Sequence, residues 1–108
     1  MLRNDFVSNS SSCSFIVGFK DKKTMENFRD ALKEEWGGKI AILLDEFFKN
    51  NEYHNQEVIK DVFKGKNLEL FYEGIYSSTE DIFDNVCVGR LIWDRVDILG
   101  KDIVAESM

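Results

Sequence analysis

The sequence contains no proline, although average usage would place about five in a chain of 108 residues. Proline-rich linkers are therefore excluded, and no change in composition marks a boundary between domains. No apolar run approaches the ~18 residues that a membrane-spanning helix needs, and no apolar stretch follows Arg3 as in a secretory signal. A content of 44% hydrophobic residues suffices for a core. We therefore expect residues 1–108 to form one cytoplasmic domain with no membrane partner.

Cysteine and histidine are scarce, because the chain has only Cys13, Cys87 and His54. Three such residues cannot build a four-ligand zinc site, and the calcium-loop pattern D-x-D-x-D-G does not occur. A small enzyme that uses either cysteine with His54 is one alternative, but nothing in the local sequence brings these groups together. We therefore predict no metal, no cofactor and no catalytic residue, and a protein that is not an enzyme.

Short periodic segments indicate the elements of the first part of the chain. Residues 14–20 are aromatic and β-branched, which favours a strand covered on both faces. Asp21 is the predicted N-cap of a helix that ends at residues 37–38, and Asn55 caps a later helix that stops at Gly65. Apolar residues at three- and four-residue spacing predict three helices. Their stripes are Met25, Phe28, Ala31, Leu32 and Trp36; Ile40, Leu43, Leu44, Phe47 and Phe48; and Val58, Ile59, Val62 and Phe63.

The second part of the chain has weaker patterns. Residues 68–73 alternate and predict a half-exposed strand, residues 79–84 a short helix, and residues 86–93 another strand. The tail fits either a final strand or a short helix. Together these segments predict an α+β fold, a single domain with a three- or four-stranded, mostly antiparallel sheet and about three helices packed on it. Trp36 and Trp93 are expected to be core anchors or, alternatively, exposed contacts at an interface.

The net charge of −6 is carried entirely by the C-terminal part. Residues 1–67 hold 11 basic and 11 acidic groups, whereas residues 68–108 hold three basic and nine acidic groups. This asymmetry favours a basic partner and disfavours nucleic acid as a ligand, although a solvated face is the plainer interpretation of the same charges. The candidate partner-binding residues are Glu69, Glu73, Glu80, Asp81 and Asp84.

Residues 3–17 read RNDFVSNSSSCSFIV. They resemble the signature R-x-D/G-F-V-S/T-N-S-S-S-S-S-F of many small, mostly uncharacterised proteins of bacteria and their phages, with Cys13 in place of a serine. The resemblance implies a bacterial or phage origin and cytoplasmic synthesis, and it assigns no catalytic residue. Residues 8–14 are almost all serine or asparagine, which is typical of a loop, so residues 1–13 are expected to form an arm that is mobile.

These observations lead to the hypothesis of a small non-enzymatic protein, encoded by a phage, that binds and modulates a bacterial host protein with a basic surface. If that surface normally binds DNA, residues 68–108 compete with nucleic acid by presenting carboxylates in place of phosphates. No direct binding of nucleic acid is expected. A structural or assembly protein that forms homo-oligomers is the alternative from a different class. The partner, the oligomeric state and the strand order stay open at this point.

Overall fold

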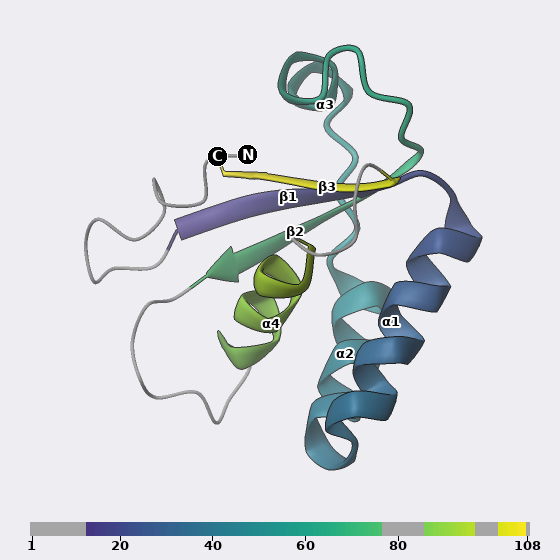
Figure 1. The fold of residues 1–108 in the computed structure, drawn as a ribbon. Helices are drawn as coiled ribbons and strands as arrows, with labels where there is room; N and C mark the ends of the chain where they lie inside the picture. The colour runs from purple at the N-terminus through teal and green to yellow at the C-terminus, as the bar shows by residue number, and fades with distance from the viewer. Residues whose placement is uncertain (1–12, 77–85, 97–101, 108) are drawn as a thin grey trace.

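The computed structural model describes residues 13–76, 86–96 and 102–107. The elements in chain order are β1 (Cys13–Phe19), α1 (Lys22–Trp36), α2 (Gly38–Asn50), α3 (Gln56–Val62), β2 (Leu70–Tyr76), α4 (Val86–Val96) and β3 (Ile103–Ser107). In these described residues the fold is α+β, as the sequence predicts, with one three-stranded antiparallel sheet and four helices (Figure 1).

The central strand of the sheet is β1, in the order β2-β1-β3, and it pairs antiparallel with both neighbours. The strand predicted over residues 14–20 is confirmed to within one residue, and residues 15–19 are all buried. Side chains of a strand alternate between faces, so Phe15 and Val17 enter one core cluster while Ile16 enters another. The continuous apolar run in β1 therefore reflects cover on both faces of the sheet.

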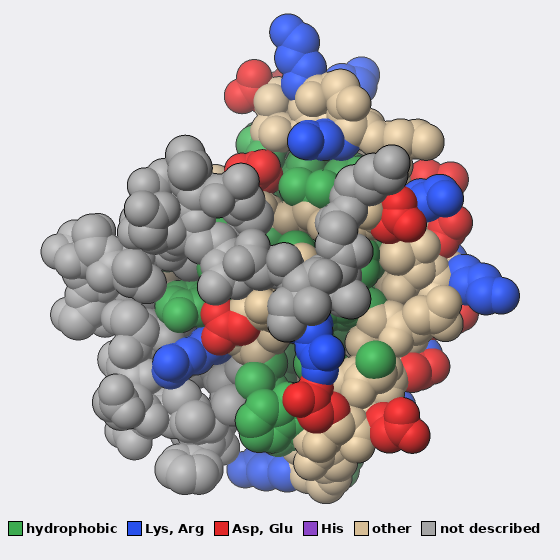
Figure 2. Space-filling view, viewed as in Figure 1, with side chains coloured by type: hydrophobic (Ala, Val, Ile, Leu, Met, Phe, Trp, Pro, Cys, Tyr) green, Lys and Arg blue, Asp and Glu red, His purple; other side chains and the backbone are tan. Residues whose placement is uncertain are grey.

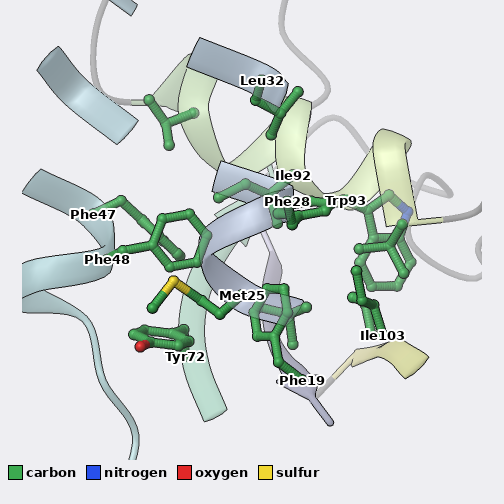
Figure 3. Packing of buried hydrophobic residues seen from close by; sticks show 14 of the residues in the cluster. Phe19, Met25, Phe28, Leu32, Phe47, Phe48, Tyr72, Ile92, Trp93 and Ile103 are labelled. Atoms are coloured by element: carbon green, nitrogen blue, oxygen red, sulfur yellow. The ribbon is translucent and has the colours of Figure 1, made fainter. Parts of the chain in front are cut away.

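The two faces of the sheet carry different layers. Helices α1, α2 and α4 lie on one side, and the short α3 lies on the other (Figure 1). Aromatic rings fill the larger layer, where Phe19 meets Phe28 at 5.4 Å and Tyr72 at 5.9 Å between ring centroids (Figure 3). On the opposite face, Phe63 after α3 packs against Phe71 of β2 at 5.2 Å. The main core therefore lies between β1 and the three-helix layer.

Capping residues set the helix boundaries where the sequence predicts them. The hydroxyl and the backbone N–H of Thr24 donate to the Asp21 carboxylate at 2.7 and 2.8 Å, and these two bonds hold the pKa of Asp21 below its ordinary value. The Asn55 side chain accepts from the Val58 N–H at 3.3 Å. Gly37 follows α1 with a φ of +62°, in the left-handed region that other residues rarely enter. The three predicted helices of the first part are confirmed, although α3 ends at Val62 and not at Gly65, which lies in the turn that follows.

The strand predicted over residues 86–93 is wrong, because this segment belongs to α4. Its β-branched residues favour a strand in isolation. However, the buried Val88, Ile92 and Val96 recur at intervals of four, which is the stripe of a helix packed on one side. A short apolar run does not distinguish a strand from a buried helix by itself, so packing against the sheet decides. The fold thereby has a fourth helix where about three were predicted.

The two tryptophans have opposite environments. Trp93 is 2% exposed and its ring lies 5.3 Å from that of Phe15, so it is a core anchor. Trp36 is 50% exposed at the end of α1, where the α1–α2 pair extends beyond the sheet (Figure 1). The core-anchor prediction is therefore confirmed for Trp93 and wrong for Trp36, which matches the exposed alternative.

The remaining predictions concern the strands and the termini. The strand predicted over residues 68–73 is present as β2, which begins and ends later. It is not half-exposed, because both faces are covered at Phe71 and Tyr72, which are 8% and 4% exposed. The tail forms the strand β3. The predicted helix over residues 79–84 lies outside the described residues, as does the predicted arm except for Cys13, which already belongs to β1.

Candidate functional site

The predicted partner-binding residues are described in part. Glu69 is exposed just before β2, and Glu73 is half-buried within β2. Both have the strand parity of Phe71 and so share its face of the sheet, the face that α3 partly covers. Phe71 lies between the two carboxylates in the chain, and its ring packs under that of Phe63. Glu80, Asp81 and Asp84 lie outside the described residues.

The structure brings together a pair of acidic residues that the sequence did not connect. Ile16 of β1 stands opposite Glu73 on one side and Glu106 on the other. Residues opposite one another in a sheet share a face, and strands two apart are separated by about 10 Å. Glu73 and Glu106 therefore flank β1 on the α3 face, and Glu106 is a candidate that sequence reasoning missed. If the tail had been assigned as a strand, the alternation of side chains would have placed Glu106 on the same face as Val104, which packs in the cluster beneath α3.

Some acidic groups on the helices have basic partners among the described residues. Lys33 pairs with Asp45 at 2.9 Å between Nζ and Oδ1 on the α1–α2 pair, and Arg95 of α4 pairs with Glu35 of α1. Within the described part of the chain, no ion pair joins Glu69, Glu73 or Glu106 to a basic side chain. We call these three residues the sheet-face carboxylates. Because they have no such counter-charge, they are available to a basic partner.

```
```

The acidic C-terminal part is interleaved in space with the electrically neutral first part. Strands β2 and β3 lie on either side of β1, so the strands of the C-terminal part belong to the same sheet as the first part. Lysines gather at the top of the molecule over α3 (Figure 2), where Lys60, Lys64 and Lys66 are exposed. Acidic and basic side chains also mix over α1 (Figure 2). Of the acidic residues after position 67 that the structure describes, Glu73 and Glu106 lie on the sheet beside β1.

The cysteine–histidine alternative depends on positions that the structure places far apart. Cys13 begins β1 opposite Tyr76 and packs against the main core. His54 has a side chain that is 75% exposed, and the residue before it donates its N–H to the carbonyl of Phe71. Phe71 and Tyr76 are separated by about 17 Å along a strand. Cys13 and His54 are therefore not within reach of one another, and the side chain of Cys87 lies outside the description.

The His, Cys, Asp and Glu side chains of the described residues form no group of three or more that could hold a metal ion. None of the helices described has the length and apolar character needed to cross a bilayer.

Comparison with known proteins finds no similarity from which to transfer a function. The chain matches no family model, no curated protein and no solved structure at a significant level.

Proposed function

We propose that this chain is a non-enzymatic, phage-encoded protein that binds and modulates a bacterial host protein through the sheet-face carboxylates. The single observation that carries the proposal is the placement of Glu73 and Glu106 on either side of Ile16. They present two negative charges on one face, and no described basic side chain pairs with them. Such an arrangement attracts a basic surface by complementary charge.

The two carboxylates can also compete with nucleic acid for a basic surface. Their strands lie about 10 Å apart across the sheet, so each carboxylate can meet a separate basic side chain of the partner. A host protein whose basic surface binds DNA would then be blocked without any contact between this chain and DNA. The resemblance of the N-terminal signature to proteins of bacteria and phages supports a bacterial cytoplasm as the setting.

The test is capture of a partner from bacterial lysate with the full chain as bait. Capture at low salt is expected to weaken strongly at ~0.5 M salt, because exposed charge pairs are screened, and duplex DNA is expected to displace the captured protein. The double substitution Glu73→Gln, Glu106→Gln should reduce capture. A matched control, Glu26→Gln and Glu34→Gln on α1, removes two charges elsewhere and should leave it intact. Salt-insensitive capture, or equal loss in both double variants, would contradict the proposal.

The homo-oligomeric alternative is favoured by a different observation. Ile42 and Ile75 are large apolar side chains with exposed fractions of 61% and 53%, so a second copy that covered either of them would bury apolar surface. A concentration-dependent, defined oligomer in light scattering, abolished by Ile75→Ser, would favour this alternative. A monomer at all concentrations would exclude it.

A further inference from the structure

A pocket of about 310 Å³ lies at the outer edge of β2, between the C-terminal half of α2 and the start of α4. Its walls are apolar and come from Leu43 and Phe47 of α2 and Val88 of α4. Ile75 of β2 forms part of its lining, and Glu46 contributes a carboxylate. The volume is at the small end of ligand pockets, which run from about 300 to 1,000 Å³, so it suits a single side chain or a small molecule.

The polar groups of this pocket are electronegative. Glu46 is exposed, and no described Lys or Arg side chain forms an ion pair with it. Asn50 and Asn51, which also line the pocket, stand at the C-terminal end of α2, where the helix dipole places partial negative charge on the last carbonyl groups. Among the described residues that line the pocket, none is basic. The pocket therefore favours a cation over an anion.

The outer edge of β2 carries backbone N–H and C=O groups that point away from β1. The Tyr53 N–H donates to the Phe71 carbonyl, and the Glu73 N–H donates to the Asn51 carbonyl, so alternate residues of β2 direct their backbone groups away from β1. Ile75 continues this alternation by two residues and directs its N–H and C=O to the same outer edge. Its side chain shares the α3 face with Glu73, whereas the pocket walls of α2 and α4 lie on the other face of the sheet. The pocket and the sheet-face carboxylates are therefore joined only around the outer edge of β2.

We propose that this pocket binds a basic side chain, an arginine or a lysine, of the protein partner. The alkyl stem would lie against Phe47, Leu43 and Val88, and the cationic head would meet Glu46 and the C-terminal end of α2. The inference rests on the proposed function, since it assigns an anchoring contact to a partner that reaches around the outer edge of β2 from the sheet-face carboxylates to the opposite face. It adds a specific anchor to a surface that otherwise recognises its partner by charge alone.

The test uses the full chain and small probes, so it does not depend on finding the partner. Amide chemical shifts are followed by NMR during titration with N-acetyl-arginine amide and N-acetyl-lysine amide, with the uncharged N-acetyl-norleucine amide as the matched probe. We expect shifts at Ile75 and Gly89, and about tenfold weaker binding after Glu46→Gln, in line with loss of one charge-assisted contact. Glu34→Gln, on the exposed surface of α1, should bind the probes as the parent does.

The outcomes separate this inference from the proposed function. Equal binding of the norleucine probe, no binding of either basic probe, or an unchanged affinity in Glu46→Gln would overturn the pocket assignment. Salt-sensitive capture that depends on Glu73 and Glu106 would still support the proposed function in that case. Conversely, probe binding that depends on Glu46, without capture of any partner, would support the pocket and count against the proposed function.

Discussion

The contact between α4 and β2 gives the sharpest test of the packing. A Cβ atom built on Gly89 would lie 2.0 Å from the carbonyl oxygen of Ile75 and 3.1 Å from its nitrogen. Real Cβ atoms essentially never come within 3.0 Å of such a neighbour, so Gly89→Ala requires a separation of at least about 1 Å. The obstructing atoms are backbone, which cannot rotate away as a side chain can. The helix and the strand must therefore move apart.

Two effects of opposite sign decide the stability of Gly89→Ala. In an ordinary helix interior, alanine is favoured over glycine by about 1 kcal/mol. Against this, overpacking of a well-filled core costs about 1–3 kcal/mol, and movement of α4 would also loosen Ile92 and Trp93, which are 0% and 2% exposed. We therefore expect the cost to exceed the propensity gain, so that the free energy of unfolding falls by up to about 2 kcal/mol, the reverse of the sign that helix propensity alone predicts.

Urea unfolding followed by circular dichroism measures this change. Ala31→Gly, at an exposed position of α1, is the matched control and should cost about 1 kcal/mol from propensity alone. If Gly89→Ala raised the free energy of unfolding by about as much as Ala31→Gly lowers it, the close approach of α4 to Ile75 would be refuted.

Three other predictions follow from single positions. Burial, together with the nearby Glu52, raises the pKa of Tyr72 above its ordinary value, so the unfolded chain loses this proton first; stability should fall as the pH rises above about 10, and Tyr72→Phe should reduce that loss in alkaline unfolding curves. Leu44→Ala removes a side chain that is 0% exposed and should cost about 2–5 kcal/mol in urea unfolding, whereas Ile42→Ala on the outer side of α2 should change stability by less than about 0.5 kcal/mol. Asn55→Ala should cost about 1 kcal/mol through loss of the cap on α3, measured in the same way.

Local chemistry explains why the first part of the chain was predictable. A cap such as Asp21 or Asn55 acts on backbone groups three residues away, and a glycine at positive φ ends a helix through its own backbone. The central position of β1 was also readable, because a strand that is apolar at every residue needs cover on both faces. None of these inferences depends on which distant segment provides the cover.

For residues 86–96, local sequence patterns did not predict the correct secondary structure. Their composition is compatible with a strand or a helix, and the choice depends on the surface that receives them. The prediction that Trp36 is a core residue is wrong for a related reason. Periodicity places Trp36 on the apolar stripe of α1, but it does not show that the helix continues past the sheet. Long-range packing, and not local propensity, determines both outcomes.

For the candidate site, too, some features follow from the sequence and others only from the tertiary structure. The sequence by itself determined that the excess negative charge resides in residues 68–108, and that Glu69 and Glu73 share a strand face. Only the tertiary structure decided that Glu106 lies across β1 from Glu73, and that Glu46 shares a pocket with Ile75. The physical reason is that charge and alternation are properties of neighbouring residues, whereas the pairing of strands and the docking of helices join residues that are far apart in the chain.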